Sequence, residues 1–354
     1  MTKPPNYPTL EERVICGPEL HFRQGTSIPK YVINFALNEG GLGDYLNYMS
    51  AILWAAKNCP WIEGRIVVVK HFIPLFRLIL ETYGVNWELV PGEDASTILR
   101  DQTPIIGPEI QMDGRNVNPQ LLNPIGAHLI DLGFAYYTNR CPAPADATLP
   151  YLDLRGAKLP HKVRHLRGRY VVITTGAMTP SRFVSGKHMN PLIDYILAEG
   201  FTPVFLGKRQ TGGHLNATFA ADIEYQKGLD LRDQTDLITA AAVMANSVGV
   251  LGIDNGLLHL AACTDANVLF GYSIAGPDQR APRRNWGMTF NLAITKKDLA
   301  CASCQSNIKI LLGHTFHKCL YEDLKCIDIL FIDQVDRWTS ALAKCFDEFK
   351  AKGD

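Results

Sequence analysis

The sequence predicts an α/β protein with two parallel-sheet domains, because strand-like and helix-like segments alternate along two separate stretches of the chain. A length of 354 residues is also long for a single hydrophobic core. Each half opens with a strand, a glycine-containing loop and a helix, which is a Rossmann-like beginning. We therefore expect doubly wound domains over residues 1–160 and 161–330, and a C-terminal helix within 331–354.

The first half begins with an irregular arm over residues 1–29, which is rich in proline and polar side chains. The pattern weakens between residues 91 and 160, where 128–134 is the one clear apolar stretch. The proline-rich end of this region, 141–160, is the expected linker. The strands expected in this half are 31–37 and 65–70, and the expected helices are 45–58 and 75–83.

The second half resumes the alternation of short apolar runs and helix-like stretches. Strands that are buried on both faces of a parallel sheet appear as continuous apolar runs, so four such runs indicate a covered sheet. The strands expected here are 170–174, 202–206, 248–253 and 268–272, and the expected helices are 191–199, 236–246 and 334–350.

Composition describes a globular protein without a preference for polyanions. The 35 basic residues balance the 35 acidic ones and no block of like charge stands out, so binding to nucleic-acid backbone is not indicated. The N-terminus lacks the apolar core of a signal peptide, and the longest uncharged stretch, 237–253, is too short for a membrane span. We expect a cytoplasmic protein whose nine cysteines are thiols or metal ligands rather than disulfides.

The most informative segment is Gly252–Ala262, where an apolar strand ends in Asp254-Asn255-Gly256 and a helix of small residues begins. The N–H groups and the dipole of a helix N-terminus attract anions. Gly256 allows a ligand to approach the main chain, and Asp254 or Asn255 can cap the first turn. The segment predicts either a site for a phosphate-bearing ligand or an ordinary capped turn.

A second candidate site follows the expected strand 170–174. Thr175, Gly176 and Thr179 precede two cations, Arg182 and Lys187, ahead of the next helix. Hydroxyls, a glycine and cations suit an oxygen-rich anion, which a guanidinium can bind through two hydrogen bonds. The alternative is a solvated loop, where arginine and lysine are usually found.

The first loop, 40–44, differs from the common phosphate-binding patterns. Leu46 occupies the position of the third glycine of a dinucleotide fingerprint, and no Walker A sequence occurs. What remains is Asp44, at the carboxyl end of the first strand and the start of a helix. The helix dipole favours an ionised carboxylate there, able to accept a proton, although a capping role accounts for the same position.

Four cysteines gather within 26 positions near the end of the second half. Cys301 and Cys304 form a CxxC pair, and Cys319 and Cys326 follow it. Four thiolates suit a tetrahedral metal site, most simply a structural Zn²⁺, while two disulfides are the alternative. The remaining five are expected to be scattered thiols: Cys16, Cys59, Cys141, Cys263 and Cys345.

These segments together resemble glycosyltransferase family 9, the heptosyltransferase-like enzymes with the GT-B fold of two Rossmann-like domains facing across a cleft. Gly43-Asp44 before an apolar helix is similar to the family's Gly-Asp motif, and 176–187 to its phosphate-binding segment. Residues 254–262 are similar to its Asp-Thr-Gly-Leu-x-His-Leu signature, with Asn255 in place of threonine. The family's Lys-x-Trp-Pro element is absent, which leaves Arg182 or Lys187 as its cation. Some members carry a cysteine cluster, including protein heptosyltransferases that bind metal there.

The resemblance implies an inverting glycosyltransferase with Asp44 as the general base. The donor would be a nucleotide-diphosphate sugar, ADP-heptose being the commonest in the family, and backbone N–H groups of 255–257 would help to bind its diphosphate. The C-terminal helix would pack back on the N-terminal domain, as in many GT-B proteins. The implied donor-binding residues are Thr175, Gly176, Thr179, Arg182, Lys187, Asp254, Asn255, Gly256, Leu257 and His259.

Metal requirements follow from two features. No two aspartates lie two positions apart, so a catalytic Mg²⁺ on an Asp-x-Asp motif is not expected, and helix N-termini with Arg or Lys would stabilise the leaving diphosphate. A structural Zn or Fe ion is the cofactor expected at the cysteines Cys301, Cys304, Cys319 and Cys326.

The acceptor stays open between a glycan, a protein hydroxyl and a modified DNA base. A non-catalytic nucleotide-sugar-binding protein of the same fold is one alternative, although a binder has no need of a base at Asp44. A nucleic-acid-binding protein with a zinc module is another. That protein would carry a basic patch around the cysteines, whereas residues 319–328 contain Glu322, Asp323 and Asp328 against Lys325 alone.

Overall fold

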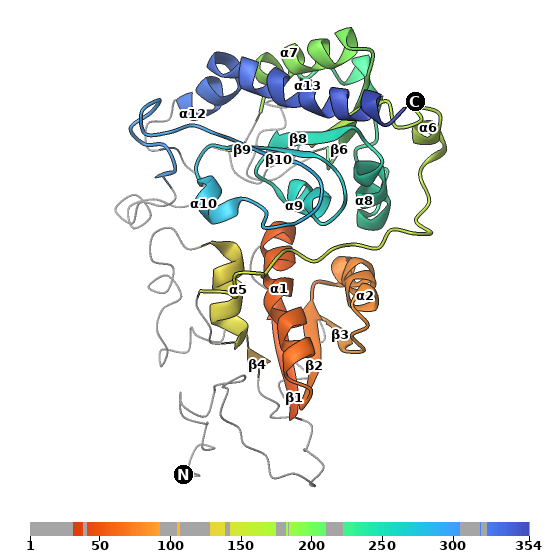
Figure 1. Ribbon diagram of the computed structural model, residues 1–354, viewed down its shortest axis with the longest axis vertical. Coiled ribbons are helices and arrows are strands. Elements are labelled where there is room, and N and C mark those ends of the chain that lie inside the picture. The colour runs from red at the N-terminus through yellow and green to blue at the C-terminus, as the bar shows by residue number, and fades with distance from the viewer. Residues whose placement is uncertain are drawn as a thin grey trace. The chain divides into compact units, whose positions relative to one another are not determined.

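The chain divides into two compact units, residues 1–150 and 151–354, and each unit has its own parallel sheet (Figure 1). The boundary between them lies inside the proline-rich stretch expected as a linker. The structure is a computed structural model that describes residues 31–37, 41–92, 105–106, 128–138, 142–174, 182, 184–209, 222–304, 319 and 324–353.

The first unit is a parallel sheet flanked by helices. Its strands are β1 (Tyr31–Leu37), β2 (Ile62–Val68), β3 (Glu88–Pro91) and β4 (Ile105–Ile106), and its helices are α1 (Leu42–Asn58), η1 (Lys70–Phe72), α2 (Ile73–Thr82) and α5 (Leu129–Thr138). The sheet order β3-β2-β1-β4 places β1 between β2 and β4. Helices α1 and α5 approach closely because Gly133 lies against the backbone of Tyr48. The Tyr48 and Tyr137 rings also meet there, with centroids 5.9 Å apart.

The second unit is a six-stranded parallel sheet covered on both faces. Its strands are β5 (Tyr170–Thr174), β6 (Thr202–Leu206), β7 (Leu229–Asp230), β8 (Gly249–Ile253), β9 (Val268–Tyr272) and β10 (Thr289–Ala293). Its helices are α6 (His161–Arg164), α7 (Gly186–Ala198), η6 (Tyr225–Lys227), α8 (Leu237–Ala245), α9 (Gly256–Ala262), α10 (Pro277–Arg280), α12 (Lys325–Asp328), the π-helix η8 (Ile329–Asp333) and α13 (Val335–Ala351).

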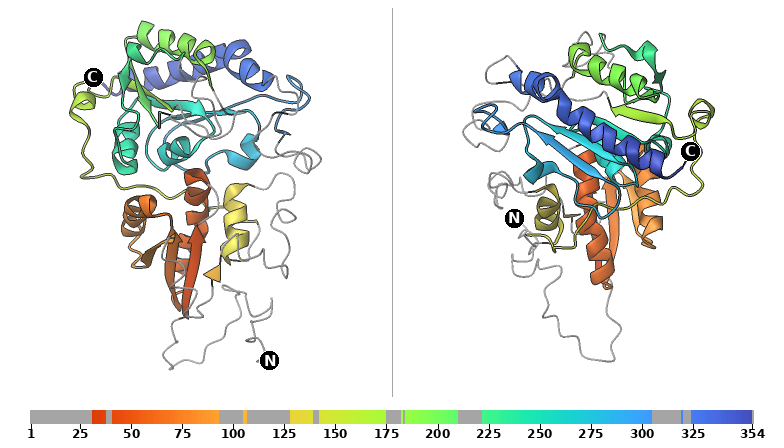
Figure 2. Two further views of the ribbon diagram at one scale, coloured as in Figure 1. Left: turned by 180° about the vertical axis from the view of Figure 1, so that it is seen from behind. Right: turned by 45° about the horizontal axis from the view of Figure 1, so that its top comes forward.

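The strand order β10-β9-β8-β5-β6-β7 is that of a doubly wound Rossmann sheet, with β5 and β8 at its centre. Helices α7 and α13 lie on one face of the sheet, and α8 and α9 lie on the other (Figures 1 and 2). The predicted α/β class with two parallel sheets is therefore confirmed.

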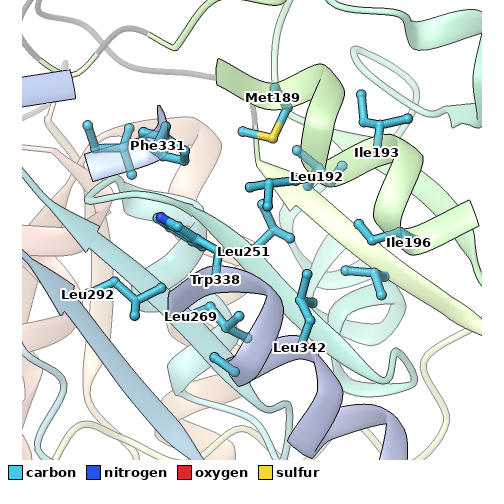
Figure 3. Close-up of a cluster of buried hydrophobic side chains, with 14 of the residues drawn as sticks. Met189, Leu192, Ile193, Ile196, Leu251, Leu269, Leu292, Phe331, Trp338 and Leu342 are labelled. Carbon is cyan, nitrogen blue, oxygen red and sulfur yellow. The ribbon is translucent and has the colours of Figure 1, made fainter. Parts of the chain in front are cut away.

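Helix α13 belongs to the core of the second unit. Its fully buried Trp338 and Leu342 pack with side chains of α7 and of the sheet (Figure 3). The Trp338 ring stacks on Phe331 at 4.7 Å, and Phe346 stacks on Phe201 at 4.2 Å. The expectation that this helix also packs back on the N-terminal domain stays a prediction.

Two further expectations concern cysteine chemistry and membranes. Cys59, expected as a thiol, is disulfide-bonded, and its partner lies outside the described residues. It is a buried residue directly after α1, and no local spacing connects it with another cysteine in the sequence. Among the helices that the structure describes, none is long and apolar enough to cross a membrane. The cytoplasmic location stays a prediction.

Leu342→Ala is expected to lower the free energy of unfolding by about 2–5 kcal/mol, because it empties a fully buried position. Urea denaturation followed by far-ultraviolet circular dichroism measures the change. Ser340→Ala, at an exposed position of the same helix, is the matched control and should change stability by less than about 0.5 kcal/mol. Equally small effects in both variants would contradict the packing of α13.

Candidate functional site

The centre of the second sheet brings the two candidate anion-binding segments to one edge. Strands β5 and β8 are neighbours, and the chain leaves β5 toward β6 but leaves β8 toward β9. Ligands of doubly wound sheets bind outside the carboxyl ends of the strands at such a switch point. The segment after Thr174 and the segment after Ile253 both start there, because the paired register aligns Thr174 with Gly252.

The ends of β5 and β8 are held close together. A Cβ atom at Gly252 would collide with the Thr174 hydroxyl, so only glycine permits this approach. The Asn255 side-chain amide donates a hydrogen bond to the same Thr174 oxygen at 3.0 Å. The first turn of α9 is therefore fixed to the end of β5.

Asn255 also caps α9. Its side-chain oxygen accepts hydrogen bonds from the N–H groups of Leu257 at 2.9 Å and Leu258 at 3.0 Å. The Leu257 N–H, one of three expected to bind a diphosphate, is thereby engaged. The N–H groups of Asn255 and Gly256 have no acceptor in the part of the chain that the structure describes, and both residues are half-exposed. These two donors are the ones suited to an incoming anion.

Asp254 is a buried carboxylate at the end of β8, only 3% exposed. The His259 ring nitrogen Nε2 lies 3.2 Å from its Oδ1 atom, and Arg182 Nη1 lies 3.5 Å from Oδ2 and 3.3 Å from the Asp254 carbonyl oxygen. Burial raises the pKa of Asp254, but the His259 hydrogen bond and the charges of Arg280 and Arg182 outweigh it. The pKa lies below its ordinary value, so the carboxylate is ionised.

His259 occupies a core position. Its side chain is 1% exposed and its ring meets Phe270 edge-on, with centroids 5.2 Å apart. Because Asp254 receives its polar contact, His259 positions that carboxylate. A direct contact between His259 and a ligand stays a prediction.

Two guanidinium groups act on the Asp254 carboxylate, Arg182 by direct contact and Arg280 through its charge. Arg182 follows β5, and Arg280 ends α10, which follows β9, the strand beside β8. Arg280 was not singled out from the sequence, because no motif marks it. The signal that could have found it is its place after the carboxyl end of a third parallel strand. The net positive charge of Arg182, Arg280 and Asp254 suits an anionic ligand.

Lys187 has a different partner. Its Nζ atom lies 2.7 Å from Oδ1 of Asp328 in α12, which also accepts from His188 Nε2 at 2.6 Å. Burial raises the pKa of Asp328, but these two contacts outweigh it and the pKa is lowered. The structure therefore brings Arg182, and not Lys187, into contact with Asp254. Thr175, Gly176 and Thr179 lie outside the described residues.

Asp44 is the third residue of α1 in the first unit. The backbone N–H of Gly41 donates to its Oδ2 atom at 2.8 Å, so the carboxylate takes part in capping the helix. The side chain is half-buried, and α1 follows β1, which lies between β2 and β4 at the switch point of this sheet. Capping and proton acceptance are compatible, because a carboxylate has several lone pairs.

The four clustered cysteines (the cysteine cluster: Cys301, Cys304, Cys319 and Cys326) are thiols, so the alternative of two disulfides is not supported. Burial raises the pKa of Cys326 to about 12, and the charges of the other three add to this effect. The sulfurs of Cys301, Cys304 and Cys319 are therefore close enough to Cys326 for their charges to affect it. Even so, no three His, Cys, Asp or Glu side chains among the described residues are arranged to hold a metal ion.

Comparison with known proteins gives structural matches only. No protein-family model matches the chain, and no curated protein matches it. The iron-containing dodecameric glycosyltransferase TibC from enterotoxigenic E. coli H10407 is 15% identical, covering 91% of this chain and 77% of its own, with a TM-score of 0.65. The glycosyl transferase family 9 structure from Veillonella parvula is 13% identical over 90% and 99%, with a TM-score of 0.60. ADP-heptose LPS heptosyltransferase II of E. coli is 16% identical over 80% and 98%, with a TM-score of 0.52.

The chain thus has the GT-B fold of glycosyltransferase family 9 structures, as the sequence motifs predicted. A further structure of TibC, in complex with ADP-D-β-D-heptose, matches with a TM-score of 0.65. At these identities the likeness establishes the fold.

Asn255→Ala is expected to lower the free energy of unfolding by about 1–2 kcal/mol, because it removes the oxygen that caps α9. It also removes the bond to Thr174. Asn255→Thr keeps a capping oxygen and should lose less than the alanine variant. Urea titration of the three proteins measures the differences, and an alanine variant as stable as the wild type would contradict the cap.

Proposed function

We propose that this protein is an inverting glycosyltransferase that moves a heptose-like sugar from a nucleotide-diphosphate donor, ADP-heptose in the first instance, to an acceptor hydroxyl. The observation that carries the proposal is the positively charged switch point of the second unit, where Arg182 contacts the buried Asp254 beside the N-terminus of α9. The printed descriptions of two structural matches, a complex with ADP-D-β-D-heptose and an ADP-heptose transferase, support the choice of donor.

The donor's diphosphate is assigned to cations and backbone donors. Arg182 and Arg280 supply charge, and the N–H groups of Asn255 and Gly256 supply hydrogen bonds. Thr175, Gly176 and Thr179, which precede Arg182 in the sequence, complete the proposed cradle. Charge stabilisation is given to these groups and not to a chelated Mg²⁺, because the sequence has no Asp-x-Asp motif. Asp254 holds Arg182 in place, and His259 in turn holds the Asp254 carboxylate.

Asp44 is proposed as the general base. Its carboxylate takes the proton of the acceptor hydroxyl while the hydroxyl oxygen bonds to the anomeric carbon. The bond from that carbon to the diphosphate breaks, and its electron pair leaves with the diphosphate. Such proton transfer contributes about 10²–10⁴-fold in rate. The first turn of α1 suits the role, because the Gly41 N–H orients the carboxylate.

Asp44→Asn is expected to lower the turnover of ADP-heptose by about 10²–10⁴-fold, because the amide cannot accept the proton. The dissociation constant for the donor should change by less than about twofold, since the donor contacts are in the other unit. Turnover on a panel of acceptors and calorimetric binding measure the two quantities. Glu81→Gln, an exposed acid on α2, is the matched control.

Arg182→Ala is expected to weaken the affinity for the donor in the same binding assay. Lys187→Ala should leave the donor affinity nearly unchanged, because Lys187 is paired with Asp328. Wild-type turnover in the Asp44 variant would remove that residue from the mechanism. Unchanged donor affinity after loss of Arg182 would overturn the donor site.

We further propose that the cysteine cluster binds one structural metal ion, Zn or Fe. Four sulfur donors match the chemistry of such sites, and the structural match TibC is described as iron-containing. The cluster lies next to α10, which carries Arg280 of the proposed donor site, and next to the first turn of α7. Ser303, inside the CxxC pair, lies against Gly276 at the start of α10, and Asp328, two residues after Cys326, holds the first turn of α7. A metal ion bound by the cysteine cluster would fix the positions of α10 and of the first turn of α7.

Protein purified without affinity metals is expected to contain about one equivalent of Zn or Fe, because four thiolates bind either ion tightly. Elemental analysis measures it. Cys326→Ser should lose the metal and lower the melting temperature, while Cys345→Ser, which changes a buried thiol outside the cluster, should keep the metal. A metal-free wild type with all four thiols titratable would refute the proposal.

A further inference from the structure

A dense group of cations precedes β5 in the second unit. The segment 154–169, named here the basic segment, includes α6 and holds six arginines and lysines in 16 positions. All six are exposed. They are Arg155, Lys158, Lys162, Arg164, Arg167 and Arg169.

Counter-charges are scarce around these cations. No Asp or Glu occurs between residues 154 and 193. Arg155 pairs with Asp153, and the Arg169 guanidinium lies over the Phe201 ring at 5.6 Å from its centroid. The side chains of the other four, Lys158, Lys162, Arg164 and Arg167, have no ion-pair or hydrogen-bond partner among the described residues.

The fold holds the basic segment firmly on the surface. Val163 of α6 is 1% exposed and anchors the helix, and Gly168 lies against the ring of Phe349 in α13. Helix α6 lies beside the C-terminal end of α13 in each view (Figures 1 and 2). Lysines at that end do not enlarge the patch, because Lys350 pairs with Glu199 and Lys352 with Glu348.

The concentration of charge is unusual for this chain. Its total charge is zero, so the residues outside the basic segment are net acidic. The expectation that no block of like charge occurs was therefore wrong. The six cations are not consecutive in the sequence, because small and apolar residues separate them, but all six are exposed on one short stretch of chain. Exposed like charges repel, and a surface without a partner normally mixes both signs. The basic segment therefore indicates an anionic partner.

We propose that the basic segment docks on the phospholipid headgroups of an anionic bilayer. Clusters of four to eight Lys or Arg side chains on a short stretch of chain are typical of segments that bind anionic lipids. Leu159 and Leu166, both half-buried, stand between the cations and add apolar surface. No Phe, Tyr or Trp occurs between residues 154 and 169, and the rings of His161 and His165 meet each other edge-on, so the row of large stacking rings of single-stranded nucleic-acid binders is missing. Docking is peripheral and oriented, because the rest of the chain is net acidic.

Vesicle sedimentation with the full-length protein tests the proposal. The vesicles are phosphatidylcholine alone, or phosphatidylcholine with about 30 mol% phosphatidylglycerol, in about 0.1 M salt. Wild-type protein should bind the anionic vesicles only. The variant Lys158→Gln/Lys162→Gln/Arg164→Gln/Arg167→Gln should bind at least ~10-fold more weakly, since each cation near such a surface adds about fivefold in affinity.

A quadruple variant with the same change in charge is the matched control. Lys57→Gln/Lys70→Gln/Lys296→Gln/Lys297→Gln neutralises four exposed lysines outside the basic segment and should bind like the wild type. Circular dichroism and melting temperature check that both variants fold. If the basic-segment variant does not fold, the wild-type protein tests the proposal by itself. Electrostatic docking requires that about 0.5 M salt release the wild-type protein from the anionic vesicles.

Three results would overturn the proposal. One is wild-type protein that fails to sediment with anionic vesicles, and another is equal loss of binding in the two quadruple variants. The third is variant-sensitive binding to a DNA or RNA duplex without binding to vesicles, which would assign the basic segment to nucleic acid.

Discussion

The buried carboxylate of Asp254 is the group on which the candidate donor site depends. A desolvated charge must be paired, and the pairing here is with Arg182 and His259. Because His259 is enclosed and Arg182 keeps 22% of its side chain exposed, the histidine fixes the carboxylate and the carboxylate fixes the arginine. The guanidinium is thus positioned before any ligand arrives, which reduces the ordering cost of binding an anion.

Sheet topology makes that pairing possible. Arg182 and Asp254 are 72 positions apart, and they meet because β5 and β8 are adjacent parallel strands whose carboxyl ends coincide. Gly252 and the bond from Asn255 to Thr174 bring the two ends together. The same principle places Asp44 after β1 in the first sheet. Each unit thus carries its proposed chemistry at the switch point of its own sheet.

Local patterns were predictable from the sequence, and long-range pairings were not. The expected strands 31–37, 170–174, 202–206 and 268–272 agree with the structure residue for residue, because nearly all their side chains are buried and apolar. Strands β3 and β10 were missed because most of their side chains are only half-buried, and β4 and β7 because they have two residues each. A cap from Asp254 or Asn255 was expected, since capping is local, and Asn255 is the residue that provides it. The contact between Lys187 and Asp328 was not, because 141 positions separate them.

The central claim is that the donor's diphosphate lies at the switch point of β5 and β8, and a crystal structure with ADP-heptose tests it most directly. The account predicts phosphate oxygens within hydrogen-bond distance of the Arg182 guanidinium and the Gly256 N–H, with Asp254 still paired to His259. Density for the nucleotide elsewhere on the protein, with the turn 254–256 closed to it, would contradict the account.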